Sequence, residues 1–374
     1  MNFNDVIGQS EIKQRLIAQA KENRVPHALM LCGPSGVGKL ALALGFAHYL
    51  LCENNADRDD ACEECRQCHM FNTFNHPDVH FVFPIVKKSG KETFCDEYIE
   101  EWRKRISTSP YFGLNHWLAD IGAPDKQPMI YEAESSAIQR KLSLKSSMGG
   151  YKVMIIWHPE KMNITCANKL LKILEEPPQK TLFILICEQP DQLLSTIVSR
   201  TQRIDVPQIE QEEIEKALIE RNYLQETDAK TIAHAANGSY LKALETIHID
   251  PDIHLFLDMY ILLMRLAYKR DIKQLSLWAE QMAKHGREKQ KMFFDYCQKM
   301  TRENFIYNFG RHEMNYQNIE EANFSVNFAR FINERNVIGI MNEINSAQRD
   351  IEQNTNSKMV FFDFALKIIV LLKQ

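Results

Sequence analysis

The sequence contains no apolar run long enough to cross a lipid bilayer. Its longest apolar stretch, residues 359–372, is interrupted by Asp363 and Lys367, whereas a spanning helix needs about 20 consecutive apolar residues. The first residues, Met1-Asn-Phe-Asn-Asp5, also lack the basic and apolar regions of a signal peptide. We therefore expect a cytoplasmic protein with no membrane partner.

The sequence also lacks an excess of positive charge. It has 45 Lys and Arg residues against 49 Asp and Glu residues, which gives a net charge of −4 with both signs interspersed. Because a chain that holds nucleic acid by itself usually presents a strongly basic surface, any DNA contact here should be local or shared with other proteins. No short internal repeat or low-complexity tract is present.

The chain of 374 residues is too long for one ordinary hydrophobic core, which predicts two or three domains. Strand-like and helix-like segments alternate up to about residue 206, a pattern typical of an α/β fold with a mainly parallel sheet covered by helices. The expected strands are 28–32, 79–84, 129–131, 152–157, 181–187 and 202–206, and the expected helices include 11–23, 40–51, 134–144 and 166–175.

The remaining segments set the expected domain boundaries. Mixed charge and repeated Gly and Pro residues indicate an insertion at 86–126 that holds one helix, 95–106. Beyond the α/β domain, 1–206, helices at 210–221, 226–237 and 240–247 predict a small helical domain, 207–250. Long amphipathic helices at 254–268, 272–285, 288–308, 323–345 and 357–372 predict an all-helical third domain, 251–374.

The sequence has nine cysteines, and disulfides are not expected in a cytoplasmic protein. Four of them cluster, with three at a Cys-x-x-Cys-x-x-Cys spacing, and four soft thiolates with no open position favour a structural Zn²⁺ site. An iron–sulfur cluster and unliganded or redox thiols remain alternatives. The candidate ligands are Cys52, Cys62, Cys65 and Cys68, within a module at 52–68.

The other cysteines and two nearby histidines have simpler interpretations. Cys32, Cys95, Cys166, Cys187 and Cys297 lie in apolar surroundings, which predicts packing roles. His69 and His76 are spare potential metal ligands that we expect at the surface.

A glycine-rich segment lies between an expected strand and an expected helix. In a phosphate-binding loop of this form, backbone N–H groups surround the phosphates, a lysine neutralises their charge and a Ser or Thr hydroxyl holds Mg²⁺. The strand–loop–helix setting favours this interpretation over a chance glycine-rich turn. The candidate nucleotide-binding residues are Gly33, Pro34, Ser35, Gly36, Val37, Gly38 and Lys39.

Two parts of the corresponding ATPase site are missing. Leu40 stands where the hydroxyl should be and cannot hold a metal. The strand at 152–157 should end in the carboxylates that bind magnesium and activate water, but it ends in Trp157 and His158. The sequence therefore predicts a protein that has the fold of an ATPase but does not hydrolyse ATP. ATP or ADP could bind to the loop without turnover, and no Mg²⁺ is expected.

Several motifs occur in the order typical of one family. They are Val6-Ile-Gly-Gln9, His27-Ala28, the loop at 33–39, the four cysteines, Gly149-Gly-Tyr-Lys-Val153, the run from Ala167 to Pro178, and Ser199-Arg200. On these motifs, residues 1 to about 245 resemble the bacterial DNA polymerase III clamp-loader subunits of the AAA+ class. The resemblance implies a P-loop AAA+ domain, a small helical lid and an all-helical collar that joins subunits together.

Within that family, the chain resembles a non-hydrolysing subunit and not the gamma/tau ATPase. Active members carry Ser or Thr at Leu40, acidic residues at Trp157 and His158, and an arginine at Leu241. Ser199-Arg200, in contrast, matches the family motif whose arginine reaches the γ-phosphate of ATP in the adjacent subunit. An arginine delivered in trans can raise the rate of phosphoryl transfer about 10³-fold or more.

The resemblance also implies partners. They are the gamma/tau and delta subunits, the sliding clamp, and primed DNA reached mainly through the complex. Three alternatives stay open from the residues alone: Arg200 as a solvated surface arginine, the whole chain as an active gamma/tau-type DNA-dependent ATPase, and the chain as a zinc-bearing adaptor that uses the AAA+ fold as a scaffold.

Overall fold

The structure is a computed structural model that describes residues 1–87, 92–247, 251–310, 315–317 and 319–373. It divides into two compact units. The first consists of Met1–Ala123, Pro128–Ala233 and Gly238–Lys242, and the second of Pro124–Gln127, His234–Asn237 and Ala243–Gln374. Among the described residues, none of the helices is long and apolar enough to cross a membrane.

A five-stranded, fully parallel sheet forms the centre of the first unit. The strands are β1(Ala28–Cys32), β2(Val79–Val82), β3(Lys152–Trp157), β4(Thr181–Cys187) and β5(Gln202–Asp205), in the order β2-β3-β4-β1-β5. β1, β3 and β4 are buried along their whole length, as their nearly uninterrupted apolar sequences predict for a sheet covered on both faces. Five of the six predicted strands are therefore confirmed.

The sixth predicted strand, 129–131, is wrong. Met129 and Ile130 make only isolated bridges, to Ile85 and to Met162. Helix α6 begins at Glu132, so the extended segment is too short to form a ladder.

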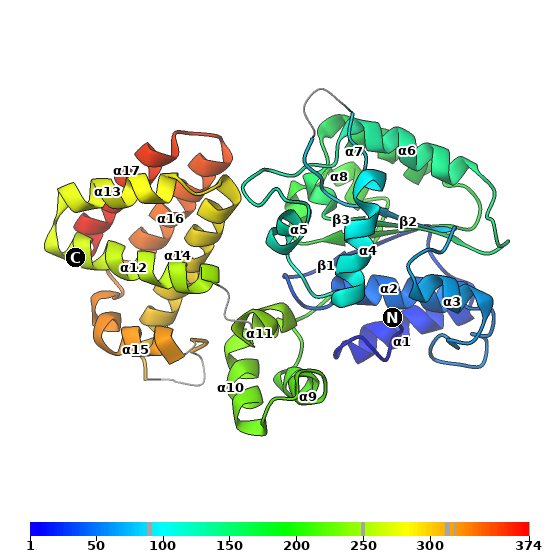
Figure 1. Cartoon of the computed structure of the whole chain (residues 1–374), viewed down its shortest axis with the longest axis horizontal. Helices are drawn as coiled ribbons and strands as arrows, with labels where there is room; N and C mark the ends of the chain where they lie inside the picture. The colour runs from blue at the N-terminus through cyan, green and yellow to red at the C-terminus, as the bar shows by residue number, and fades with distance from the viewer. Residues whose placement is uncertain (88–91, 248–250, 311–314, 318, 374) are drawn as a thin grey trace. The chain divides into compact units, whose positions relative to one another are not determined.

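Helices cover both faces of the sheet (Figure 1). α1(Ser10–Lys21), α2(Lys39–Leu51) and α3(Arg66–Asn72) lie on one side, and α6(Glu132–Ser143) and α7(Ile164–Glu175) lie on the other. The short helix α8(Ser195–Val198) precedes β5. Because α2 follows β1 directly and is buried on nearly every side, the loop between them is held at the carboxyl edge of the sheet.

The insertion contains more helix than the sequence predicts. A 3-10 turn η1(Cys95–Tyr98) leads into α4(Ile99–Thr108), and a second helix, α5(Leu114–Asp120), begins after Gly113. Trp117 anchors α5 in the core, where its indole N–H donates to the Pro84 carbonyl at 2.7 Å. The sequence does not predict this helix, because Gly113 reads as a helix breaker, whereas in the structure it is the N-cap residue of α5.

The helices of the small helical domain form as predicted. They are α9(Gln211–Asn222), α10(Glu226–Ala236) and α11(Tyr240–Ile247). The division into two units cuts through α10 and α11, so the boundaries 1–206, 207–250 and 251–374 stay predictions.

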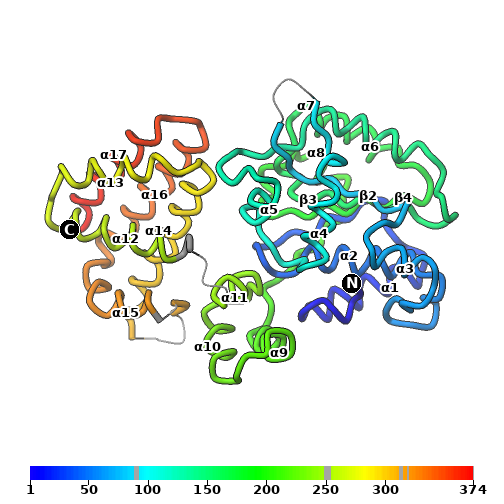
Figure 2. Tube along the Cα trace, in the orientation of Figure 1, coloured from blue at the N-terminus to red at the C-terminus, as the bar shows by residue number. Residues whose placement is uncertain are grey.

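The second unit is a helical bundle, which Figure 2 shows as the yellow-to-red part of the tube. Its helices are α12(Pro251–Lys269), α13(Ile272–Ala283), α14(Arg287–Tyr307), α15(Ile319–Phe328), α16(Val337–Glu352) and α17(Ser357–Leu371). Trp278, Phe293, Phe294 and Phe361 are fully buried in its core.

The single helix predicted at 323–345 is wrong, because two helices and a break occupy this stretch. A 3-10 turn η5(Ala329–Phe331) ends the first helix. The buried Asn336 side chain then accepts from the Asn333 N–H at 2.9 Å and donates to the Phe331 carbonyl at 2.8 Å. Asparagine that bonds to nearby backbone competes with continuing helix, so the chain turns here.

Candidate nucleotide and metal sites

The glycine-rich loop connects β1 to α2 as the sequence predicts. Gly36 and Gly38 have φ values of +79° and +91°, a left-handed conformation that residues with a side chain rarely adopt. Gly38 is the N-cap of α2, and Lys39 is its first residue. The loop therefore has the backbone form that presents N–H groups to an anion at a helix N-terminus.

Lys39 points into the protein and its ammonium group has protein partners. The Nζ atom donates to the carbonyls of Gly33, at 2.7 Å, and of Pro34, and lies 3.4 Å from a carboxylate oxygen of Glu188. Only 5% of the residue is exposed. Burial lowers the pKa of Lys39, and the charge of Glu188 opposes that shift.

Leu40 and Trp157, two of the residues expected in place of magnesium ligands, lie in apolar packing. Leu40 is buried at the start of α2. Trp157, at the end of β3, lies 5.0 Å from Phe112 and 5.2 Å from Trp102 between ring centroids. Both partners come from the insertion, so the insertion helps to bury the end of the strand where an ATPase would hold its metal.

Two glutamates near Lys39 were not identified from the sequence. Glu160 lies in the turn η2(Pro159–Lys161) after β3, where a carboxylate oxygen is 3.0 Å from His158 Nδ1 and accepts from the Glu188 N–H at 3.1 Å. Burial opposes ionisation, but the hydrogen bond and charge of His158 lower the pKa of Glu160 to about 2. Glu188 follows β4. Glu160 and Glu188 lie between the motifs at 149–153, 167–178 and 199–200 and belong to none of them. The motif spacing therefore does not single them out.

Arg200 lies just beyond α8, before the edge strand β5. Its guanidinium is 2.7 Å from Glu175 and donates to the Thr196 carbonyl at 3.0 Å. About a third of the side chain is exposed. Ser199 is exposed, and its hydroxyl donates to the Thr196 carbonyl at 3.1 Å. Their partners, Glu175 and Thr196, are separate from the glycine-rich loop.

The four clustered cysteines meet at one point between α2 and α3. Cys52, Cys62, Cys65 and Cys68 are all buried, and their sulfur atoms lie within 4.8 Å of one another. The Cys68 sulfur is 3.4 Å from that of Cys65 and 3.8 Å from that of Cys62. Bonds of about 2.3 Å to a tetrahedral zinc ion place sulfurs about 3.8 Å apart, so this donor set fits Zn²⁺.

Backbone amides support the negative charge of these sulfurs. The N–H groups of Cys62, Cys65 and Cys68 donate to cysteine sulfurs at 3.3, 3.4 and 3.5 Å. Burial opposes ionisation of Cys62, but hydrogen bonds from the Glu64 and Cys65 amides lower its pKa to about 6. Such donors favour the thiolate, the form that binds a metal.

The remaining cysteine and histidine predictions can now be judged. The cysteines predicted to pack are all buried: Cys32, Cys95, Cys166, Cys187 and Cys297. His69 is exposed as expected, but the expectation for His76 is wrong. His76 is 3% exposed, where its ring bonds to the Gln67 side chain and to the Asp78 N–H. The His76 ring is therefore part of the folded core and is not a spare metal ligand at the surface.

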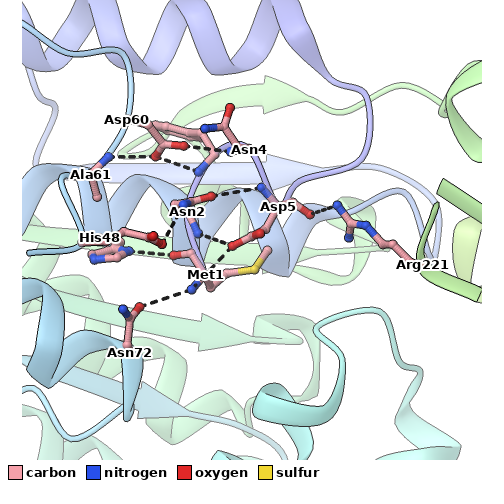
Figure 3. Close-up of polar contacts among 11 residues, drawn as sticks. Met1, Asn2, Asn4, Asp5, His48, Asp60, Ala61, Asn72 and Arg221 are labelled. Carbon is pink, nitrogen blue, oxygen red and sulfur yellow. Dashed lines mark hydrogen bonds and ion pairs between the residues drawn. The ribbon is translucent and has the colours of Figure 1, made fainter. Parts of the chain in front are cut away.

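The loop that carries the cysteines holds the N-terminal segment in place (Figure 3). The carboxylate of Asp60 accepts from the N–H groups of Phe3 and Asn4, both at 2.9 Å. His48, on α2, bonds to the Met1 carbonyl at 2.8 Å. Arg221, on α9, donates to the Asp5 carbonyl at 2.9 Å. The cysteine loop, α2 and α9 are thus joined through one short segment.

A glycine-rich loop between β1 and α2, at the carboxyl edge of a parallel sheet, defines a P-loop α/β domain. The family described as "DNA polymerase III, delta subunit" matches residues 8–210. The match spans more than half of the chain, and the chain belongs to this family.

The chain is also similar in sequence to subunits of bacterial DNA polymerase III. The chain is 31% identical over 215 residues to the DNA polymerase III subunit delta′ of Bacillus subtilis (57% of this chain, 52% of the relative). It is 27% identical over 187 residues to the subunit delta′ of Escherichia coli (50% and 44%), and 29% identical over 250 residues to the subunit tau of B. subtilis (66% and 37%). The chain thus spans about half the length, or less, of the curated relatives it matches.

Among solved structures, a DNA polymerase III gamma-subunit-related protein of Thermotoga maritima is 15% identical, with a TM-score of 0.39 and coverage of 97% of this chain and 99% of that one. The RuvB Holliday junction branch migration motor of the same organism is also 15% identical, with a TM-score of 0.39 and coverage of 65% and 62%.

Proposed function

We propose that the chain is a non-hydrolysing delta′ subunit of the DNA polymerase III clamp loader in the cytoplasm. In this proposal it works beside the gamma/tau and delta subunits, which together open the sliding clamp and place it on primed DNA. The observation that carries the proposal is a pattern of loss and retention: Leu40, Trp157 and Leu241 replace three groups that hydrolysis needs, while Arg200 is kept.

Arg200 is the proposed contribution to catalysis, as an arginine finger with Ser199 beside it. Its guanidinium is partly exposed, and it is held by an ion pair with Glu175 and by a hydrogen bond to the Thr196 carbonyl. An exposed pair of this kind contributes less than about 1 kcal/mol, so a phosphate group of a neighbouring subunit can displace Glu175. The planar N–H donors of the Arg200 guanidinium would then stabilise the negative charge that develops on the phosphoryl group in the transition state.

The four buried cysteines are proposed to hold one structural Zn²⁺. The donor set is closed, since four thiolates fill a tetrahedral ion and leave no position for substrate. In the same proposal, the lid (207–250) completes the AAA+ module, and the collar (251–374) joins the chain to other subunits.

The Arg200→Ala variant tests the proposed finger. It should fold and assemble normally, because an exposed arginine contributes little to the stability of the free chain. The reconstituted clamp loader should lose about 10³-fold in turnover at the site that Arg200 serves, measured as ATPase stimulated by clamp and primed DNA, and clamp loading should fall with it. Arg200→Lys should rescue poorly, because an ammonium lacks the planar fork.

Arg203→Ala is the matched control. Arg203 is also an exposed arginine, three residues further along on β5, and pairs with Asp205 on its own strand. Its loss should leave ATPase activity unchanged. Wild-type turnover in an intact Arg200→Ala complex would show that Ser199-Arg200 is an ordinary surface turn.

A second candidate, an active gamma/tau-type ATPase, is favoured by the similarity to the tau subunit over 66% of this chain. The two proposals differ in one measurement. Hydrolysis of ATP by the isolated chain, abolished by Lys39→Ala, would select the ATPase. A zinc-bearing adaptor outside the clamp loader would instead fail to co-assemble with gamma/tau and delta.

A further inference from the structure

Lys39 already has the partners that a nucleotide would supply. A lysine ammonium has three N–H donors, and Nζ has three acceptors within the protein: the Gly33 carbonyl, the Pro34 carbonyl and a carboxylate oxygen of Glu188. The first two belong to the loop itself. The third acceptor is a carboxylate, whereas the lysine of a nucleotide-bound P-loop binds phosphate oxygens.

Glu188 is fixed in this position by its neighbours. It follows the end of β4, next to β1 in the sheet, and its own N–H donates to Glu160 at 3.1 Å. The side chain remains 29% exposed. It lines a pocket of about 830 Å³ together with Gly33 and Pro34, so a small anion can reach this point from solvent.

Protein groups also pack on the glycines of the loop. A Cβ atom added at Gly36 would lie 2.1 Å from the Ser239 hydroxyl and 2.7 Å from Leu241 Cβ, and one added at Gly38 would lie 3.3 Å from the Tyr111 ring. Ser239 and Leu241 therefore pack closely on Gly36, and Tyr111 packs on Gly38.

Hydrogen bonds hold these segments on the loop. Ser239 donates through its hydroxyl to the Ser35 carbonyl, and the Tyr240 N–H donates to the Gly36 carbonyl, both at 3.0 Å. The Tyr111 hydroxyl accepts from the Ile7 N–H at 2.9 Å, and its ring packs edge-on against Tyr240 with centroids 5.0 Å apart. The N-terminal segment, the insertion and the start of α11 therefore meet at the loop.

We propose that Glu188 is an internal counter-ion that replaces the nucleotide phosphate at Lys39, and that Tyr111, Ser239 and Leu241 close the loop around it. The loop keeps its phosphate-binding form because a carboxylate of the same chain neutralises the lysine. This inference deepens the proposed function, since it explains how a subunit that does not hydrolyse ATP keeps an ordered loop without nucleotide.

The test uses thermal unfolding of the isolated full chain with inorganic pyrophosphate as the probe. Glu188→Gln removes the charge and keeps the size of the side chain. It should lower the Tm of the unit by roughly 2–4 °C, and millimolar pyrophosphate should restore the loss, because the substitution leaves Lys39 without its anionic partner beside the pocket that Glu188 lines. Sodium chloride at matched ionic strength should not restore it.

Three further variants separate a counter-ion from a merely structural residue. Glu188→Asp should lose less stability than Glu188→Gln and should respond less to pyrophosphate, since it keeps the charge that competes with the anion. In a Lys39→Met/Glu188→Gln double variant the response to pyrophosphate should disappear. Glu210→Gln removes the same charge from the wall of the same pocket and should show neither the loss nor the rescue.

The inference is overturned if Glu188→Gln is as stable as wild type, or if pyrophosphate stabilises wild type and Glu210→Gln equally. It is also overturned if the wild-type chain binds ADP with micromolar affinity in calorimetry, a measurement that does not depend on how well any variant folds. None of these results bears on Arg200, which is tested by the turnover of the assembled complex.

Discussion

Glu160 and His158 form a buried pair at the end of β3, at the place where an ATPase carries its metal-binding carboxylates. The Glu160 side chain is only 2% exposed and accepts hydrogen bonds from the ring of His158 and from the backbone of Glu188. The carboxylate is therefore committed to holding the turn after β3 and the start of the segment after β4. Both contacts give this buried acidic residue a structural role.

Glu160→Gln should destabilise the chain in a pH-dependent way. The folded-state pKa of Glu160 is about 2, below its ordinary 4.5, despite burial and because of His158. A depressed pKa contributes stability above pH 4.5 that is lost as the pH falls toward 2. The loss on substitution should be on the order of 3 kcal/mol at neutral pH and should shrink as the pH falls through this window.

Chemical denaturation between pH 7 and pH 3 measures this effect. Glu176→Gln changes an exposed glutamate at the end of α7 and should have no comparable effect at either pH. A loss for Glu160→Gln that stays constant across the range would mean that size and packing, and not the charge, account for its role.

At the scale of elements, the cysteine loop between α2 and α3 is joined to α1, to α2 and to the N-terminal segment by several hydrogen bonds. Asp60 holds the backbone of residues 3 and 4, and the segment continues to Ile7, whose N–H donates to Tyr111. A metal in the cysteine cluster would therefore order both its own loop and the N-terminal segment that reaches the glycine-rich loop.

Cys65→Ser should release the proposed zinc and loosen two separate stretches. Metal binding and local folding are coupled in sites of this kind, so hydrogen exchange should accelerate in residues 52–76 and at the amides of Phe3 and Asn4. Exchange in β1, β3 and β4 should change much less. Metal analysis of freshly purified wild type should find one zinc per chain.

Cys297→Ser is a suitable control, because Cys297 is buried in the second unit. It should affect the stability of that unit and leave the metal content unchanged. Less than half an equivalent of zinc in wild type, or iron with visible absorbance, would reject the zinc assignment.

At the scale of the whole molecule, the proposed loss of hydrolysis rests on three places: the start of α2, the end of β3 and the start of α11, where the resemblance to clamp-loader ATPases predicts a metal ligand, carboxylates and an arginine. In this chain these positions hold Leu40, Trp157 with His158, and Leu241. The insertion adds Phe112 and Trp102 to the surroundings of Trp157. Restoring one group leaves the others absent.

The isolated chain should therefore show no significant ATPase activity, with or without primed DNA. Leu40→Thr alone should not create activity. Phosphate release by the purified chain measures this, and Lys39→Ala identifies any contaminating ATPase, whose rate it would leave unchanged. A rate that disappears with Lys39→Ala would contradict the prediction.

The sequence by itself determined the parts of this protein that depend on local pattern. Nearly uninterrupted apolar runs predict β1, β3 and β4 with their observed bounds, because a strand buried on both faces favours apolar side chains along its length. Lys152 and Thr181, at the first positions of β3 and β4, are the polar exceptions. The spacing of three cysteines likewise predicts that their sulfurs meet at one point, and the glycines within residues 33–38 predict the loop between β1 and α2. The second helix of the insertion and the break at 329–336 were missed, because glycine and asparagine there act through capping contacts that spacing does not reveal.

Only the tertiary structure decided which residues meet at the glycine-rich loop. Ile7, Tyr111, Glu188 and Leu241 come from four distant segments, and each makes its contact because the sheet, the insertion and the first turn of α11 pack together. Nothing in the spacing around Glu188 distinguishes it from another glutamate beyond a strand. Its role follows from its distance to Lys39, and that distance depends on the register of β4 beside β1, a contact between residues more than 150 positions apart.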